Sequence, residues 1–329
     1  MAAAQQLARV GHDVHVFERE AKIGGLMRYG IPDFKMEKHF IDRRVEQMQG
    51  EGVSFHCNVN IGVDKTVAEL EAEFDAIIYC GGAETPREAG IPGADLSGVH
   101  PAMNFLVQQN KRVGREASIQ SVGWASDSIM ASGKHVVVVG GGDTASDCVG
   151  TSFRQGAVKV TQLDIRPQPP EKEDKLAVWP YWATKMRTSS SQAEGAEREF
   201  QVATLEFIGD EGVLTHVKCC EVNEKREPIA GSEFYIRADL AFIAIGFAGP
   251  YEHQGPIAEL GDKIEINADR RGNRSVKAND KDYKTAHEKF FVAGDARRGQ
   301  SLVVWAIREG RQAARSVDEF LMGATTLPR

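Results

Sequence analysis

One segment constrains the fold more than any other part of the chain. Residues 134–166 read KHVVVVGGGDTASDCVGTSFRQGAVKVTQLDIR, and Val136 to Val139 form a β-branched run typical of a buried parallel strand. Three glycines follow, then a stretch that we expect to be helical to about Gln155, with Gly156 as its C-cap. A second strand is expected from Val158 to Ile165. This strand–turn–helix–strand order predicts an α/β dinucleotide-binding unit.

The glycine loop of this segment has the pattern G-x-G-x-x-A, with alanine in the place of the third glycine. Gly140 permits the tight turn, and Gly142 has no Cβ, so a pyrophosphate can approach the backbone beside Gly141. N–H groups at the start of the helix, near Asp143 and Thr144, point toward such phosphates. The flanking strand and helix favour a dinucleotide site over a tight glycine-rich turn alone.

The sequence gives weaker evidence on whether the nicotinamide cofactor is NADH or NADPH. Asp164, near the end of the second strand, could accept a hydrogen bond from a ribose 2′-hydroxyl, which favours NADH. Arg166, just beyond it, and Arg154 could hold a 2′-phosphate, which favours NADPH. We expect NADPH, and NADH remains the alternative.

The opening residues MAAAQQLARVGHDVHVFERE indicate a second, incomplete unit. They predict a helix, a turn at Gly11 and a strand from Val14 to Phe17 that ends in Glu18. A strand-end acid of this kind holds the ribose of a dinucleotide. Two glycines at Gly24 and Gly25 then let the backbone run close to a ligand.

The last part of the chain predicts a further strand, from Phe290 to Ala293, that ends in Gly294 and Asp295. A helix is expected from Ser301 to Leu321. An acid at a strand end before a helix N-terminus can hold a ribityl hydroxyl while the helix dipole faces a flavin. The adjacent Arg297 and Arg298 could face a flavin phosphate, an acidic partner or solvent.

Composition narrows the class of protein. The 329 residues suffice for two domains, and a net charge of −7 argues against a nucleic-acid partner. No apolar run is long enough to span a membrane and no signal peptide is recognisable, so we expect a cytoplasmic protein.

The five cysteines contain no C-x-x-C pair, so no iron–sulfur cluster or zinc ribbon is expected within the chain. No catalytic or metal-binding constellation is recognisable, and residues 167–175 and 189–200 are expected to be loops.

Five stretches together resemble the small-subunit family of NADPH-dependent glutamate synthase, and similar stretches occur in the flavin region of dihydropyrimidine dehydrogenase. They are IGGLMRYGIPDFKMEK, FDAIIYCGGAETPRE, VVVVGGGDTASDCVGTSFRQGA, WPYWATKMRTSSSQAEGAEREF and VAGDARRGQSLVVWAIREGRQAA. The resemblance covers essentially the whole chain. It implies a glutathione-reductase-like α/β flavoprotein with two dinucleotide-binding domains. The FAD-binding domain would comprise residues 1–105 and 246–329, and the inserted NADPH-binding domain residues 106–245.

Carried over by position, the resemblance implies contacts with two cofactors. FAD contacts are implied at Glu18, Arg19, Gly25, Leu26, Lys35, Gly294 and Asp295. NADPH contacts are implied at Gly141, Gly142, Asp143 and Thr144, with Arg166 as the candidate for the 2′-phosphate. Ala244 to Gly246 would lie at the domain junction.

Two departures from the family pattern matter. Family members begin with a cysteine-rich domain associated with iron–sulfur clusters, followed by a strand and a G-x-G-P-A-G loop, and neither is present here. We therefore expect an N-terminally truncated flavoprotein that holds FAD weakly, because the loop that would cradle the FAD pyrophosphate is missing.

The resemblance implies an electron-input subunit that passes hydride from NADPH to FAD and electrons onward to a large subunit that makes glutamate. Two alternatives stay open. One is a stand-alone NAD(P)H:acceptor flavin oxidoreductase. The other is a truncated, redox-inactive fragment that binds NADPH or a partner.

Overall fold

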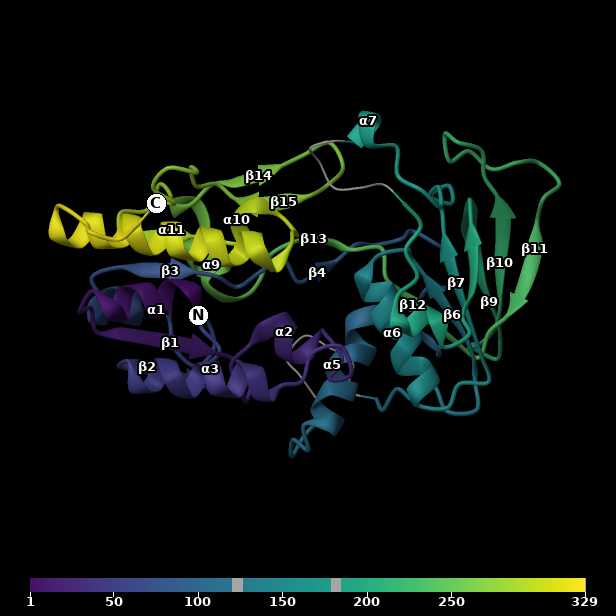
Figure 1. The fold of residues 1–329 in the computed structure, drawn as a ribbon, viewed down its shortest axis with the longest axis horizontal. Helices are drawn as coiled ribbons and strands as arrows, with labels where there is room; N and C mark the ends of the chain where they lie inside the picture. The colour runs from purple at the N-terminus through teal and green to yellow at the C-terminus, as the bar shows by residue number, and fades with distance from the viewer. Residues whose placement is uncertain (120–126, 179–184, 329) are drawn as a thin grey trace. The chain divides into compact units, whose positions relative to one another are not determined.

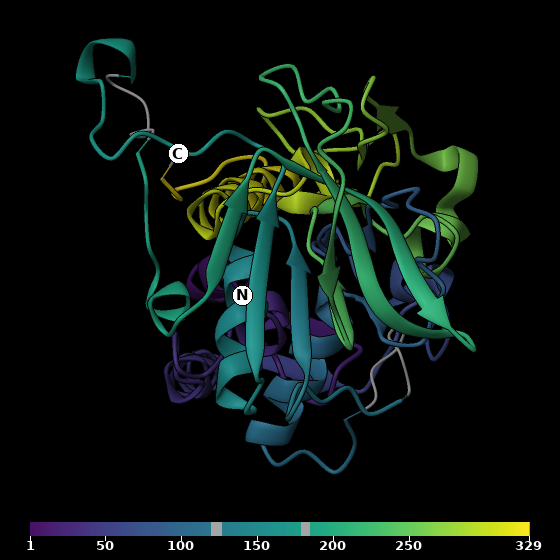
Figure 2. The ribbon, with the colours of Figure 1, turned by 90° about the vertical axis from the view of Figure 1, so that its right-hand side faces the viewer.

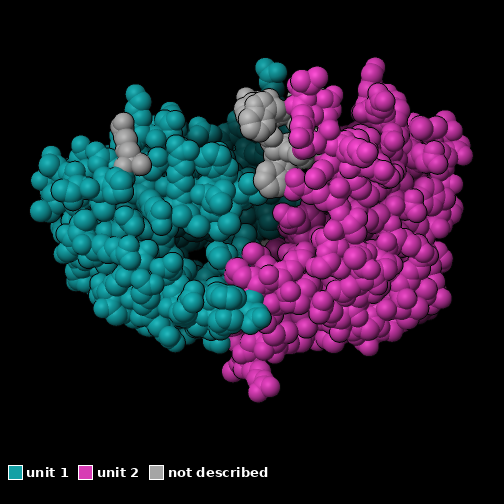
Figure 3. Space-filling model, viewed as in Figure 1, with its two compact units in different colours: residues 1–28, 37–87, 246–329 teal, residues 29–36, 88–245 magenta. Residues whose placement is uncertain are grey.

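The computed structural model describes residues 1–119, 127–178 and 185–328. The chain divides into two compact units, shown in separate colours in Figure 3. Unit 1 comprises residues 1–28, 37–87 and 246–329, and unit 2 comprises residues 29–36 and 88–245.

The described elements of unit 2 alternate between strands and helices and then continue as a run of strands. In chain order they are β5 (Val99–Pro101), α5 (Ala102–Val113), β6 (His135–Val139), α6 (Asp143–Arg154), β7 (Lys159–Asp164), α7 (Lys175–Val178), α8 (Ser190–Ala193), β8 (Glu197–Phe200), β9 (Val202–Asp210), β10 (Val213–Glu221), β11 (Phe234–Arg237) and β12 (Leu240–Ile243).

A parallel sheet forms the centre of unit 2, with the described strands in the order β5-β12-β6-β7-β8 (Figure 2). The predicted strand–helix–strand is confirmed, since β6, α6 and β7 each differ from the expected bounds by one residue. The valine run occupies a central position between β12 and β7, which explains why all four valines are buried.

Both faces of this sheet are covered. Alternate side chains point to opposite faces, so Phe242 of β12 stacks on Phe105 of α5 with ring centroids 4.2 Å apart. Val137 and Ala241 point the other way and join an apolar cluster with Phe207 and Leu214, from the antiparallel sheet β11-β10-β9. Unit 2 is therefore a three-layer structure of helices, parallel sheet and antiparallel sheet.

The structure differs from expectation in residues 189–200, where the sequence predicts a loop. Ser189 caps the short helix α8 through a reciprocal pair of hydrogen bonds with Gln192. Residues 197–200 then pair with Thr161–Asp164 as the edge strand β8. The polar, charged composition that suggested a loop belongs instead to a sheet edge.

The structure also groups residues 88–105 with unit 2, whereas the sequence predicts a boundary at residue 106. The physical reason is that β5 pairs with β12 in the central sheet and α5 packs on α6. Residues 29–36 join unit 2 as well, because the Asn110 side-chain amide donates to the carbonyls of Tyr29 (3.0 Å) and Gly30 (3.3 Å).

Unit 1 is drawn from both ends of the chain. Its described elements are α1 (Ala2–Arg9), β1 (Val14–Glu18), α2 (Gly25–Tyr29, whose last residue falls in unit 2), α3 (His39–Gly50), β2 (Val53–Cys57), α4 (Val67–Glu73), β3 (Ile77–Tyr79), β4 (Thr85–Pro86), β13 (Phe247–Gly249), α9 (Gly255–Leu260), the 3₁₀ turn η1 (Gly261–Lys263), β14 (Ile266–Ala268), β15 (Arg274–Val276), β16 (Phe290–Val292), α10 (Asp295–Arg298) and α11 (Val303–Met322).

Two parallel strand pairs organise unit 1 (Figure 1). β1 pairs with β2, and β16 pairs with β3, and among the described residues they remain separate sheets. One apolar cluster nevertheless joins them: Val14 and Phe291 pack with Leu7 of α1 and Val317 of α11. The strands predicted before Glu18 and Gly294 and the predicted C-terminal helix are confirmed. None of the helices in the described part of the chain is both long and apolar enough to cross a membrane.

The aromatic pair in unit 2 provides a test of this packing. Phe242 is 0% exposed, so Phe242→Ala should lower the free energy of unfolding by about 3–5 kcal/mol, through the cavity it leaves beside Phe105. Urea denaturation monitored by circular dichroism measures this. Tyr235→Ala, at a side chain that is 60% exposed, should change stability by about 0.5 kcal/mol or less. Equal effects of the two substitutions would contradict the assigned core.

Candidate functional site

Two backbone neighbours of Gly140 shape the glycine loop between β6 and α6: the carbonyl of Ala244 and the carbonyl of Leu163. Gly140 adopts φ +135°, and a Cβ there would lie 2.3 Å from the carbonyl oxygen of Ala244. Its N–H donates to the carbonyl of Leu163 at 2.8 Å. Only glycine fits this position, because a side chain would separate β6 from the strands on either side.

The surroundings of Gly142 are open, whereas those of Gly140 are crowded. Gly142 is the N-cap of α6, and a Cβ at this position would meet nothing within 4 Å. The first-turn N–H groups of the 12-residue helix, which include those of Asp143 and Thr144, have no acceptor within the helix. The loop thus leaves the positive end of α6 open for an anion.

A carboxylate and a guanidinium form a fork beside this loop. Arg166 donates from Nε to Oδ1 of Asp164 (3.0 Å), from Nη2 to Oδ2 (2.8 Å) and from its backbone N–H to Oδ1 (3.0 Å). These bonds raise the pKa of Arg166. A Cβ on Gly141 would lie 1.6 Å from Asp164 Oδ2, so the middle glycine makes room for the carboxylate.

Arg154, the other sequence candidate for a 2′-phosphate, lies at the opposite end of α6 from the loop. It pairs with Glu194 at 2.8 Å, and its guanidinium lies 4.0 Å from the ring centroid of Phe34. The structure therefore brings Arg166, and not Arg154, to the glycine loop.

Lys35 also contacts α6. Its ammonium lies 2.6 Å from Asp147 Oδ1 and donates to Ser146 Oγ at 3.0 Å. The resemblance implies an FAD contact for Lys35, and that contact stays a prediction.

In unit 1, Glu18 lies at the end of β1 as predicted. Its Oε1 accepts the backbone N–H of Glu20 at 2.9 Å, and burial raises the pKa of Glu18. Gly25, at the start of α2, adopts φ +52° and has no atom within 4 Å of where a Cβ would be. The next residue, Leu26, is 43% exposed. The strand-end acid and an accessible glycine thus lie on the same connection, as a bound ribose would require.

Arg19 is held by a residue that the sequence did not single out. Its guanidinium donates to Glu84 Oε2 at 2.6 Å and lies 5.8 Å from the centroid of the Tyr251 ring. Burial raises the pKa of Glu84, and the charge of Arg19 opposes this. Nothing in the sequence marked Glu84, because the two residues are 65 positions apart.

Gly246 leads into β13 and adopts φ +96°. A Cβ there would lie 2.9 Å from the Gln300 side chain, whose Oε1 accepts the N–H of Phe247 at 2.7 Å. Within unit 1, Gly246 therefore lies beside the segment between α10 and α11.

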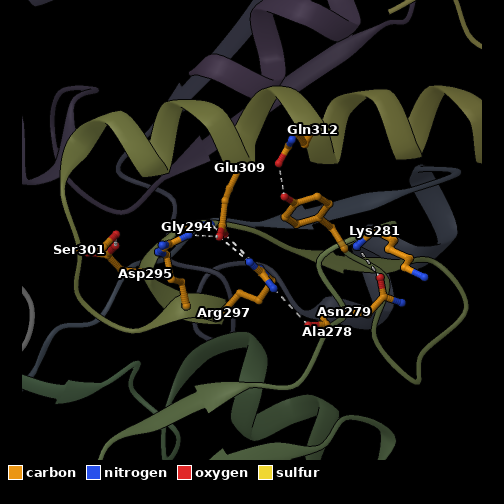
Figure 4. Close-up of polar contacts among 11 residues, drawn as sticks. Ala278, Asn279, Lys281, Gly294, Asp295, Arg297, Ser301, Glu309 and Gln312 are labelled. Carbon is orange, nitrogen blue, oxygen red and sulfur yellow. Dashed lines mark hydrogen bonds and ion pairs between the residues drawn. The ribbon is translucent and has the colours of Figure 1, made fainter. Parts of the chain in front are cut away.

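Figure 4 shows the turn that follows β16. Gly294 adopts φ +73°, and its N–H donates to Glu309 Oε2 at 2.9 Å. Asp295 accepts from the Ser301 hydroxyl at 2.8 Å, and burial raises the pKa of Asp295. Arg297 and Arg298 both pair with the buried carboxylate of Glu309, and the Arg298 side chain is still 36% exposed. A flavin phosphate or an acidic partner near this basic pair stays a prediction.

The sequence analysis missed Glu309, which lies within the helix segment AIREGRQAA. A charged residue between small apolar residues at helical spacing is the available signal. The burial of Glu309 within unit 1 is known only from the structure.

The fold and the family are shown by comparison with known proteins. The model of the pyridine nucleotide-disulphide oxidoreductase family matches residues 1–310. The NADPH glutamate synthase small chain of Mycobacterium tuberculosis is 47% identical over 331 residues, which are 100% of this chain and 66% of that one. The corresponding chain of Bacillus subtilis is 38% identical and is covered to 67%, so this chain spans about two thirds of the length of these relatives.

Solved structures show the same fold at low identity. FprA of Mycobacterium tuberculosis in complex with NADPH has a TM-score of 0.71 and 16% identity, over 99% of this chain and 84% of that one. Thioredoxin reductase of T. acidophilum has a TM-score of 0.61 and 16% identity, over 96% and 93%. The predicted α/β fold class and the resemblance to glutamate synthase small subunits are confirmed.

The loop geometry predicts opposite outcomes for neighbouring glycines. Gly140→Ala should lower the free energy of unfolding by about 1–3 kcal/mol or more, because the added methyl group meets the Ala244 carbonyl and the residue is left-handed. Gly142→Ala adds a methyl group in open space and should cost only the poorer N-capping of alanine, about 0.5–1 kcal/mol. Thermal or urea denaturation of both variants measures the difference, and equal losses would contradict this geometry.

Proposed function

This chain belongs to the pyridine nucleotide-disulphide oxidoreductase family, and on that premise we propose that it is an NADPH-dependent FAD oxidoreductase. The observation that carries the proposal is the glycine loop of unit 2, with its open helix N-terminus and the Asp164–Arg166 fork beside it.

The residues of unit 2 fit NADPH in two respects. The space beside Gly142 would admit a pyrophosphate to the first-turn N–H groups of α6, near Asp143 and Thr144. The carboxylate of Asp164 already accepts hydrogen bonds from both the side chain and the backbone N–H of Arg166, so it is a poor acceptor for a ribose hydroxyl. Arg166 remains 53% exposed at its side chain and can also bind a 2′-phosphate, which favours NADPH over NADH.

The residues of unit 1 fit FAD. Glu18 ends a parallel strand and would accept hydrogen bonds from a ribose, with Arg19, Gly25 and Leu26 close to it in the chain. Asp295, fixed by Ser301, would accept from a ribityl hydroxyl. All of these contacts are proposals.

Bound NADPH and FAD would supply the chemistry, hydride transfer from the nicotinamide to the flavin. The chain's own residues bind and orient the cofactors, and a hydride transfer of this kind requires positioning more than an acid–base pair. We therefore assign no catalytic residue.

For the whole protein, we propose the role of electron-input subunit of glutamate synthase. The names of the curated relatives support this role, which would include a large-subunit partner that receives the electrons for glutamate synthesis. Iron–sulfur clusters would belong to other parts of such a complex, and a cytoplasmic location follows as a prediction.

A stand-alone NAD(P)H:acceptor oxidoreductase is the second candidate. The whole-chain match to FprA and thioredoxin reductase, which are named without a glutamate synthase partner, favours it. Co-purification with an amidotransferase-bearing large subunit would decide for the glutamate synthase role. A redox-inactive protein that binds NADPH or a partner is the third candidate, and the next experiment tests it.

We expect the purified chain to retain a fraction of FAD, supplied in large excess, after rapid gel filtration, and we expect this flavin band to bleach on anaerobic addition of NADPH. The physical reason is that unit 1 keeps the acids at both strand ends, Glu18 and Asp295. A visible absorbance spectrum before and after NADPH measures this. A colourless protein at every FAD concentration would overturn the FAD proposal and leave the redox-inactive candidate.

The nicotinamide preference has its own test. Arg166→Ala should weaken NADPH binding by about 10–100-fold, through loss of a charge-assisted contact to the 2′-phosphate, and should leave NADH binding unchanged or stronger. Isothermal titration with each cofactor measures both. Lys159→Ala is the matched control, because Lys159 pairs with Glu197 at the other end of the same strand. An unchanged NADPH affinity in Arg166→Ala would contradict the assigned role.

A further inference from the structure

Glu309 is the most deeply buried charged residue of α11, whose inward face also carries small residues and Asp318. It is 2% exposed, and it lies in α11 near Ala313 and Ala314, which are fully buried. Burying a carboxylate costs several kcal/mol unless it is fully paired, and an apolar side chain of the same size often stabilises a fold better. Its presence therefore needs a reason beyond stability.

Its two oxygens contact one short stretch of chain. Oε2 accepts from the Gly294 N–H at 2.9 Å and from Arg297 Nε at 3.1 Å. Oε1 accepts from Arg297 Nη2 and from Arg298 Nη1, the latter at 3.3 Å. All four donors belong to the turn between β16 and the end of α10, so the carboxylate ties this turn to the second turn of α11 (Figure 4).

A second group holds Arg297 from the other side. Its guanidinium lies 4.9 Å from the ring centroid of Tyr283, and the Tyr283 hydroxyl donates to Gln312, one helical turn beyond Glu309. Tyr283 is 2% exposed and adopts φ +59°, a left-handed conformation that costs energy for an aromatic residue. Arg297 is thus held between Glu309, a residue of α11, and Tyr283, whose hydroxyl bonds to α11.

Asp295 immediately follows the Gly294 amide that Glu309 binds. We infer that Glu309 is a positioning residue: it fixes the Gly294–Asp295 turn on α11 and so aims the Asp295 carboxylate at the ribityl chain of FAD. This inference rests on the proposed FAD site. Glu309 does not act as a ligand itself, since both of its oxygens already accept from protein donors.

The same contact restricts what Gly294 can do. Its N–H already donates to Glu309. Gly294 would therefore contribute to the FAD site in two other ways: it has no side chain to block the cofactor, and its left-handed backbone shapes the turn. The turn would then contact FAD through the Asp295 carboxylate, as an acceptor, and not through the Gly294 N–H as a donor.

A double-mutant cycle separates positioning from general stabilisation. FAD affinity would be measured by fluorescence titration for the unmodified chain, Asp295→Ala, Glu309→Gln and the double variant. The amide of Glu309→Gln keeps the size but presents an N–H group to Arg297, so each single variant should bind FAD about 10-fold or more weakly. Because Glu309 acts through Asp295, the double variant should be within about 2-fold of Asp295→Ala.

The controls keep the outcomes distinct. Glu319→Gln, on an exposed part of the same helix, should bind FAD like the unmodified chain, and NADPH affinity should not change in any variant. If Glu309→Gln does not fold, Glu309→Asp takes its place, since the shorter side chain keeps the charge but draws back from the Gly294 amide.

Two results would overturn the inference while the proposed function stands. One is an unchanged FAD affinity in Glu309→Gln, and the other is losses that multiply independently, to about 100-fold in the double variant. Failure of the unmodified chain to bind FAD would instead overturn the proposed function, and this inference with it.

Discussion

Parallel strand pairing is the constraint on which the rest of this structure depends. Parallel strands bring their carboxyl ends to one edge of a sheet, and each chain turn at that edge can present an acid or a glycine to a ligand. In unit 2 this edge carries Gly140 and Asp164, after β6 and β7. In unit 1 the pairs β1-β2 and β16-β3 are separate sheets, and each carries its own residue at this end: Glu18 is the last residue of β1, and Gly294 follows β16. Within each sheet, parallel pairing therefore sets the end of the strands at which the candidate site residues lie.

Local patterns made the dinucleotide unit of unit 2 predictable. The valine run, the glycine loop and the second strand lie within one continuous segment, and the Asp164–Arg166 fork joins residues two positions apart. The edge strand β8 was missed because its outward side chains are charged, and its identity as a strand comes from its neighbour β7. The boundary at residue 106 failed for the same reason: β5 is too short to be recognised without β12 beside it.

The residues that support the site were not predictable in this way. Glu84 reaches Arg19, and Glu309 reaches Gly294, only because strands and helices distant in sequence fold together. A sequence pattern identifies residues whose role depends on their neighbours in the chain. It does not identify a buried acid whose partner lies on another element, except as an unexplained charge on an apolar helix face.

The segmented make-up of unit 1 has a consequence for how the chain is synthesised. Unit 2 is nearly continuous, so the ribosome has released almost all of it before the last segment of unit 1 emerges. β3 must wait for β16, because Ile77 pairs with Phe290 near the other end of the chain. During that interval the apolar strand edge of the N-terminal segment is exposed, as in other proteins with long-range parallel pairing. Unit 1 is therefore the part of the chain whose strand pairing is completed last during synthesis.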